Sequence, residues 1–232
     1  MIDLETTTRA LECLLALAFI QAGLEHIRAA IGARERWLFV ARIGLSVLLL
    51  LGVAVPWVLG LHLILALMIL DRFQGPYNGG SDRMALLILT CVAAARIFPA
   101  YAELAIGYLA MQLILSYVIS GAVKIANPDW RTGRALRDVF AFSAYPVSDA
   151  LRGWADWPRV LWVMSWAVML FEILFPLALT SQLGLALALG LAAGFHLANA
   201  CLFGLNRFFW IWIAAYPSIW WFQGRIFGAG VM

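Results

Sequence analysis

The sequence predicts an all-α membrane protein: a polytopic bundle of about eight transmembrane helices with one short amphipathic helix at the membrane interface. Of its 232 residues, 64% are hydrophobic and 12% are charged, and the mean hydropathy is +0.90. Soluble domains carry about 25% charged residues, so this composition is typical of a membrane-embedded chain. No polar stretch is long enough to form a separate soluble domain, and we therefore expect a single domain over residues 1–232.

Long apolar runs recur along the chain. A helix that crosses a bilayer needs about 20 apolar residues, or about 17 at the short end. Tryptophans gather near the ends of these runs, as expected of side chains that lie at the membrane–water interface. The expected spans are residues 10–30, 37–55, 57–73, 84–99, 101–123, 159–181, 183–203 and 208–225.

The stretch between the fifth and sixth spans is too polar to cross a membrane. Within it, Arg134 and Arg137 alternate with apolar residues such as Leu136 and Val139. Apolar residues on one side of a short basic helix are typical of a helix that lies in the interface plane. We therefore expect a short interfacial helix over residues 131–142.

Most basic side chains fall on one side of the predicted membrane. With the eight spans above, thirteen of the sixteen lysines and arginines lie on that side, in four loops. Basic residues concentrate in cytoplasmic loops, so we expect this side to face the cytoplasm and both termini to lie outside. The net charge of +3 is too small to indicate a nucleic-acid partner, and the expected surroundings are membrane lipid. The four loops are residues 28–42, 71–83, 124–159 and 204–207.

Lys124 is the only lysine in the chain, and every other basic residue is an arginine. It stands where the apolar run 101–123 meets the polar stretch 127–131. Arginine keeps its charge under almost any burial, whereas a desolvated lysine can lose its proton and act as a base near pH 7. A lone lysine at this position is therefore either an interfacial anchor or a reactive group.

Two ionisable residues lie well inside the sixth and seventh spans. Glu172 falls near the middle of one and His196 about two-thirds along the next, with Asn199 one turn further on the same face. These two spans are joined by a very short turn, so we expect them to be antiparallel neighbours. Such residues either form a functional site or hydrogen-bond a neighbouring helix and fix the packing. The histidine spacing predicts no metal site.

Four short sequence pieces, in this order along the chain, resemble the HTTM membrane-domain family, which is related to the vitamin K-dependent γ-carboxylase. No one piece is specific by itself, but their order is informative. The resemblance extends over roughly residues 8–222. The pieces are residues 77–82 (YNGGSD), 117–130 (YVISGAVKIANPDW), 171–176 (FEILFP) and 195–204 (FHLANACLFG).

The resemblance implies a membrane enzyme that binds a quinone or another lipid-soluble substrate, with Lys124 as the base that acts on the hydroquinone. Gly79 and Gly80 stand where the carboxylase has a histidine, so that residue is not carried over. Smaller bacterial members imply a peptide or thiol-redox partner and a bacterial inner membrane. The implied site has Lys124 and His196 as catalytic residues, and Asn78, Ser81, Asp82, Trp130, Glu172 and Asn199 as substrate-binding residues.

Two other functions remain open from the residues. In a non-catalytic membrane partner for peptide maturation, immunity or assembly, Lys124 would pair with Asp129 or a lipid phosphate. A transporter would show internal repeats and broken helices at matching positions. Pro176 and Pro217 are the expected breaks inside spans, and the two halves show no convincing similarity.

Overall fold

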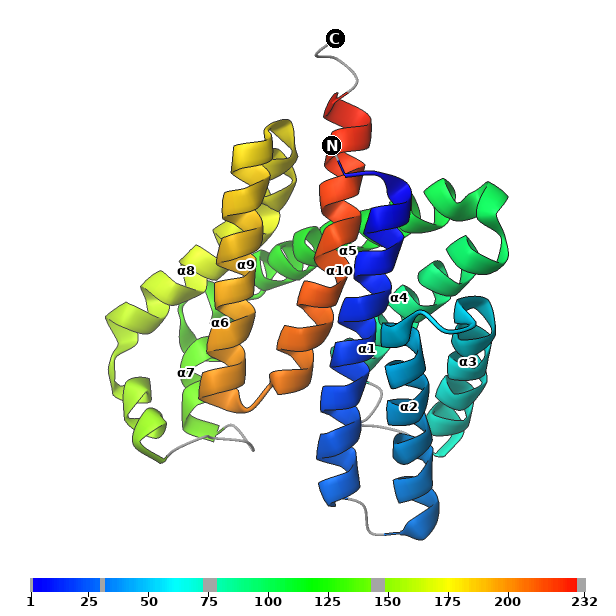
Figure 1. Ribbon diagram of the computed structural model, residues 1–232. Coiled ribbons are helices and arrows are strands. Elements are labelled where there is room, and N and C mark those ends of the chain that lie inside the picture. The colour runs from blue at the N-terminus through cyan, green and yellow to red at the C-terminus, as the bar shows by residue number, and fades with distance from the viewer. Residues whose placement is uncertain (1, 30–31, 73–78, 143–148, 229–232) are drawn as a thin grey trace. The chain divides into compact units, whose positions relative to one another are not determined.

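The computed structural model describes residues 2–29, 32–72, 79–142 and 149–228, and every regular element in these ranges is a helix (Figure 1). The all-α prediction is therefore confirmed. The chain forms two compact units, one of residues 1–111 with 207–232 and the other of residues 112–206. The single domain expected over residues 1–232 stays a prediction, because each unit is described by itself.

The first unit is built around the helical pair α1 and α2, with α3 packed on α2 and α4 (Figure 1). Leu11, Leu15 and Phe19 are fully or almost fully buried, and their spacing of four residues places them in one stripe along α1. Although α1 is apolar on most sides, this stripe is the face that packs against the other helices of the unit. The helices are α1 (Leu4–Ala29), α2 (Ala33–Leu51), α3 (Val55–Arg72), α4 (Gly80–Ile97), the start of α5 (Ala102–Ala126) and α10 (Asn206–Phe227).

The turn between α2 and α3 begins at Gly52, whereas the predicted spans 37–55 and 57–73 placed it at residue 56. Gly52 has a positive φ of 72°, and its N–H donates to the carbonyl of Leu49, while the N–H of Val53 reaches back to Leu48. This is the usual glycine end of a helix, because glycine adopts the left-handed conformation without a Cβ penalty. Pro56 then lies in the first turn of α3, where a missing N–H does no harm.

The second unit contains the remainder of α5 and the interfacial segment. The predicted helix over residues 131–142 is interrupted at Gly133, whose φ is +78°. A Cβ on Gly133 would lie 2.9 Å from the Cα of Trp162, so glycine also allows this corner to approach α8 closely. The elements after α5 are α6 (Pro128–Arg131), α7 (Arg134–Phe142), η3 (Asp149–Asp156), α8 (Pro158–Leu174), η4 (Phe175–Thr180) and α9 (Gln182–Phe203).

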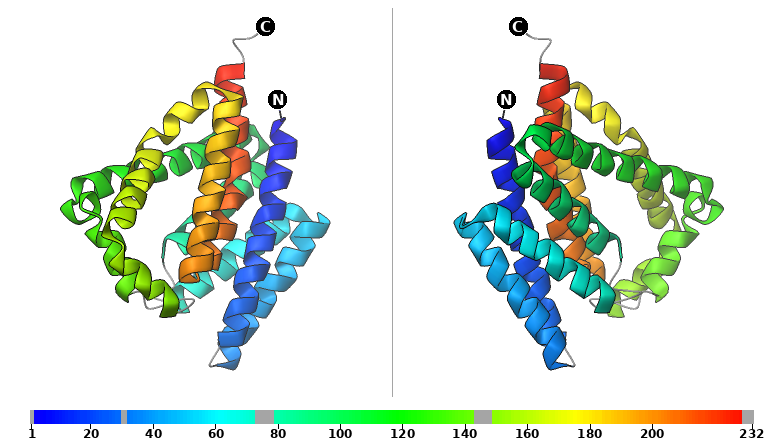
Figure 2. Two further views of the ribbon diagram at one scale, coloured as in Figure 1. Left: turned by 90° about the vertical axis from the view of Figure 1, so that its left-hand side faces the viewer. Right: turned by 90° about the vertical axis from the view of Figure 1, so that its right-hand side faces the viewer.

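Helices α8 and α9 meet at η4 and diverge from it (Figure 2). The expectation of antiparallel neighbours along their length is therefore wrong. Pro176 has no N–H to donate to the α-helical ladder, and the chain changes to a 3-10 helix at Phe175. The change redirects the chain before Ser181, whose side chain accepts the N–H of Gly184 and starts α9.

Helices occupy all eight predicted places, but the count of about eight transmembrane spans is not confirmed. Among the described residues, four helical segments are long and apolar enough to cross a membrane, and Val55–Asp71 is a shorter apolar helix. The difference has two causes: α2 and α4 carry several charged residues, and α10 is rich in tryptophan and other residues that are only weakly apolar. The four segments are Leu4–Ala29, Pro99–Ala126, Pro158–Thr180 and Gln182–Phe203.

Candidate functional site

The site in the second unit begins where α5 approaches α8 at Gly121. A Cβ on Gly121 would lie 2.8 Å from the backbone nitrogen of Ile173 and 3.1 Å from the Cβ of Glu172. Both distances are shorter than ordinary contacts, so only glycine fits without a shift of the backbone. The close approach brings the side chain of Lys124, one turn further along α5, to the buried carboxylate on α8.

Lys124 forms an ion pair with Glu172. Its Nζ lies 2.6 Å from each carboxylate oxygen of Glu172 and 2.7 Å from the hydroxyl oxygen of Ser120. The side chains are 16% and 4% exposed, respectively. An ammonium group has three hydrogens, and these three contacts use all of them. The pair is therefore a closed, almost dry arrangement that joins α5 to α8.

Trp130 covers one side of the ammonium group. Its ring centroid lies 5.2 Å from Nζ, within the range of a cation–π contact. The hydroxyl of Ser165 donates to the carbonyl of Trp130 at 2.5 Å, and the Trp166 indole donates to the carbonyl of Arg131 at 3.1 Å. These two bonds tie the short helix α6 to α8, and they place the Trp130 ring beside Lys124.

A second polar pair lies two turns earlier on α5. The hydroxyl of Tyr117 is 3.2 Å from Nε2 of His196, and both residues are buried. The Tyr117 ring stacks on Phe175, with centroids 4.3 Å apart, and meets Phe171 edge-on. Seven residues separate Tyr117 from Lys124, so both lie on one face of α5. The sequence reasoning did not assign Tyr117 to the site, although this spacing could have found it.

The structure brings together some of the predicted site residues. Lys124 contacts both Glu172 and Trp130, whereas the imidazole of His196 lies beside the hydroxyl of Tyr117. The alternative pairing of Lys124 with Asp129 is wrong. The carboxylate of Asp129 lies 3.9 Å from Arg134, and Lys124 pairs instead with Glu172 on α8.

The remaining predicted residues lie elsewhere in the chain. Asn199 is half-buried in the last turn of α9, where its carbonyl accepts the N–H of Gly204. Ser81 and Asp82 belong to the first turn of α4 in the first unit. Asn78 lies outside the described residues. A common pocket of these residues with Lys124 therefore stays a prediction.

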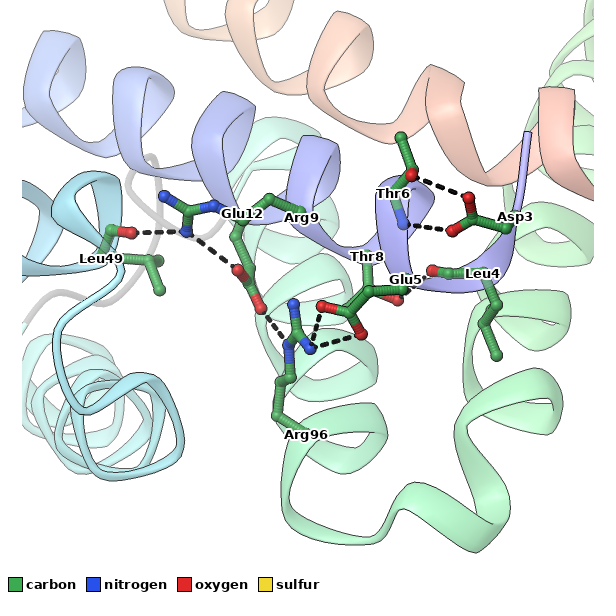
Figure 3. Close-up of polar contacts among 9 residues, drawn as sticks. All are labelled: Asp3, Leu4, Glu5, Thr6, Thr8, Arg9, Glu12, Leu49 and Arg96. Carbon is green, nitrogen blue, oxygen red and sulfur yellow. Dashed lines mark hydrogen bonds and ion pairs between the residues drawn. The ribbon is translucent and has the colours of Figure 1, made fainter.

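The first unit holds a different buried ion cluster (Figure 3). The Glu12 side chain is fully buried and accepts from Nε of Arg96 at 2.5 Å and from Arg9 at 3.0 Å. Arg9 also donates to the carbonyl of Leu49 at 2.8 Å, and Arg96 continues to both carboxylate oxygens of Glu5. The cluster connects the start of α1 to the C-terminal ends of α2 and α4.

The described residues contain no group of three or more histidine, cysteine, aspartate or glutamate side chains able to hold a metal ion.

Comparison with known proteins identifies the family. A family model described as the HTTM domain matches residues 95–222, which is more than half of the chain and includes Lys124, Glu172 and His196. The piece at residues 77–82 that also carried the resemblance lies outside this match. No curated protein and no solved structure matches the chain significantly. The HTTM family is linked to vitamin K-dependent carboxylase-like proteins. With its apolar helices and this match, the chain is a membrane protein that belongs to the HTTM family.

Proposed function

We propose that the protein is a membrane enzyme that removes a proton from a lipid-soluble, quinol-like substrate, with Lys124 as the base. The observation that carries this proposal is the contact between the only lysine of the chain and the buried carboxylate of Glu172. Both residues lie within the part of the chain that matches the HTTM domain.

The pair offers a route to a neutral amine. Burial disfavours charged groups, and a lysine–carboxylate pair can relieve that penalty by moving one proton from Nζ to the carboxylate oxygen. The products are an uncharged amine and a carboxylic acid. The amine then takes the proton of a substrate hydroxyl, and the ammonium group that forms stays beside the new phenolate and stabilises it.

Aromatic side chains supply a surface for the substrate ring. Phe171 and Phe175 pack around Tyr117 on the same face of α5 as Lys124. The hydroxyl of Tyr117 and the imidazole of His196 supply a second polar group two turns away. In this proposal the imidazole of His196 forms a hydrogen bond with the oxygen of the substrate that is farther from Lys124.

A second candidate is a non-catalytic membrane partner that assists peptide maturation, immunity or assembly, with a peptide or thiol-redox protein as its partner. One observation favours it: all three hydrogens of the Lys124 ammonium group already have acceptors. In this function the ion pair ties α5 to α8 and never releases its proton.

The variant Lys124→Arg separates the two functions. Arginine preserves the positive charge but does not deprotonate, so the proposed base is lost while the ion pair is retained. The purified protein would be given a reduced short-chain naphthoquinone in aerated detergent solution, with binding followed by tryptophan quenching. Turnover is the oxidation of the deprotonated quinol by dissolved O₂, followed as oxygen uptake above the rate without protein. We expect the wild type to bind and turn over, the variant to bind with at least a hundredfold lower turnover, and Arg159→Lys to behave as wild type.

The outcomes are distinct. Unchanged turnover in Lys124→Arg contradicts the base role. Failure of the wild-type protein to bind the reduced quinone contradicts the enzyme proposal and leaves the partner function.

We also propose a bacterial inner membrane as its location, with the arginine-rich loops in the cytoplasm and more than four helices crossing the bilayer. Arg9, Arg96 and Arg225, the three basic residues assigned to the opposite face, all pair with glutamates, so they add little positive charge there. Labelling of single cysteines introduced at residues 36 and 228 from outside intact cells tests this; labelling at residue 36 contradicts it.

A further inference from the structure

The first unit contains a second polar site that the proposed function does not use. Two small adjoining cavities lie among α1, α2, α4 and their neighbours; their volumes are about 40 and 20 Å³, and both are partly open to the outside. Phe19, Arg42 and Asp82 line both cavities, and Arg207 lines the smaller one. The lining of the larger cavity combines the charged residues Arg42 and Asp82 with apolar residues that include Ile69 and Leu86.

Arg42 is a cation with spare donors. Its guanidinium carbon lies 3.7 Å from the centroid of the Phe19 ring, and no carboxylate of the described residues is within ion-pair distance of it. A guanidinium group has five N–H donors in a planar fork that matches the oxygens of a phosphate. A half-buried, charged arginine needs an anion or water to use those donors.

Asp82 and Arg207 complete the polar part of the site. Arg207 lies 3.7 Å from Oδ1 of Asp82 and 3.9 Å from Glu25, which are loose ion pairs rather than hydrogen bonds, and 3.2 Å from Nε2 of His26. The other carboxylate oxygen of Asp82, Oδ2, is buried with no hydrogen-bond partner among the described residues. The site therefore offers spare donors on one side and a spare acceptor on the other.

We propose that this site binds an anionic phospholipid whose head group carries free hydroxyls. The guanidinium groups of Arg42 and Arg207 would hold the phosphate oxygens, and Oδ2 of Asp82 would accept a head-group hydroxyl. The apolar residues of the larger cavity would contact the upper part of an acyl chain. Basic pockets between membrane helices on the cytoplasmic side are known to suit lipid head groups.

The surrounding charge supports a membrane lipid as the source of the phosphate. Arg28, Arg34, Arg36 and Arg83 are exposed at the same end of the helices that carry the site. Each basic residue near an anionic membrane surface adds to the attraction for its lipids. The site thus lies where phosphates of the bilayer surface are concentrated.

The test measures lipid binding to the detergent-purified full-length protein by native mass spectrometry and by thermal unfolding. The lipids are phosphatidylglycerol, phosphatidylmethanol, which is anionic but has no head-group hydroxyls, and phosphatidylcholine. We expect phosphatidylglycerol to bind the wild type at least tenfold more tightly than phosphatidylcholine and to raise the unfolding midpoint. Arg42→Gln should reduce that preference about tenfold, while Arg159→Gln, at an exposed arginine of the second unit, should leave it unchanged.

Asp82→Ala provides the second variant, and it keeps the proposal testable if Arg42→Gln does not fold. It should remove the preference for phosphatidylglycerol over phosphatidylmethanol, about threefold to tenfold in the wild type. Equal binding of phosphatidylglycerol and phosphatidylcholine to the wild type overturns the proposal, as does a preference that survives Arg42→Gln. Stabilisation by inorganic phosphate alone, with displacement of the lipid, assigns the site to free phosphate and overturns the lipid as its ligand. The lipid test needs neither the quinol nor Lys124, so its failure is distinguishable from failure of the enzyme assay.

Discussion

Two buried carboxylates, Glu12 in the first unit and Glu172 in the second, are neutralised in different ways. Glu12 is shared by Arg9 and Arg96, and Arg9 also donates to the carbonyls of Leu49 and Leu50 on another helix (Figure 3). Glu172 is held by one lysine, which is itself bonded to a serine of its own helix. The first arrangement is a branched network across three helices, and the second is a single pair.

Both carboxylates are buried, so burial does not distinguish them. The type of cation does: arginine suits a purely structural ion cluster, whereas lysine suits a group that exchanges protons. Guanidinium groups stay charged in proteins, so Glu12 lies in a permanently ionic cluster. An ammonium group can give up its proton when desolvated, so the proposed base mechanism gives the Lys124–Glu172 pair a neutral form that the cluster of Glu12 lacks. Stability and function should therefore respond differently to matched substitutions at the two carboxylates.

Replacing each carboxylate by an amide tests this difference most directly, and it should give the largest change in the free energy of unfolding. Glu12→Gln leaves the guanidinium group of Arg9 without a carboxylate and that of Arg96 with only the exposed Glu5, and we expect the free energy of unfolding to fall by about 3 kcal/mol. Glu172→Gln should reduce it by only about 1–2 kcal/mol, because Lys124 can release its proton instead. Reversible denaturation in detergent micelles, followed by tryptophan fluorescence, measures both.

The control is Glu103→Gln, which removes an exposed ion pair with Arg225 and should change stability by less than about 1 kcal/mol. An equal loss for Glu12→Gln and Glu172→Gln would mean that Lys124 stays charged, contrary to the proposed base.

A methyl group at Gly121 tests whether the close approach of α5 to α8 is needed for the Lys124–Glu172 pair. Gly121→Ala places a Cβ 2.8 Å from the backbone nitrogen of Ile173, and backbone cannot move aside as a flexible side chain can. We expect a loss of about 1–3 kcal/mol in unfolding free energy, together with reduced turnover, because α5 is pushed away from α8.

Gly194→Ala is the matched substitution, since no atom lies within 4 Å of the Cβ it would add. It should be neutral or stabilise the helix by up to about 1 kcal/mol. If Gly121→Ala were equally harmless, the close approach of the two helices would not be what holds the pair together.

The smallest effect should come from Asp3, at the edge of the Glu12 cluster. The backbone N–H of Thr6 donates to Oδ1 at 2.7 Å and its hydroxyl to Oδ2 at 3.0 Å, and these bonds hold the pKa of the Asp3 carboxyl below its ordinary value. A lowered pKa in the folded state means stability that is present above about pH 4 and is lost as the pH falls through the folded value.

The variant Asp3→Asn keeps an acceptor at the start of α1 but cannot titrate. Unfolding midpoints measured from pH 6 to pH 3 should therefore decline slightly more steeply for the wild type than for the variant. Parallel curves would show that the cap of α1 contributes nothing to the acid sensitivity of this cluster.

The sequence predicted much of the fold and one half of the candidate site. The positions of all eight helical stretches follow from the apolar runs, and the lone lysine marks the site because every other cation is an arginine. A break at Pro176 was predicted, and a 3-10 helix begins there at Phe175. The break at Gly133 was not predicted, because it depends on a close contact with α8 rather than on periodicity.

The sequence by itself determined that the chain is helical, that its apolar helices suit a membrane, and that Lys124 is chemically distinct. These properties follow from composition and local spacing. Only the tertiary structure decided that Glu172, 48 residues away, is the partner of Lys124, and that Arg9 and Arg96 share Glu12. Asp129 was an equally reasonable partner in the sequence, and the choice was made by the approach of α5 to α8 at Gly121, which no local pattern records.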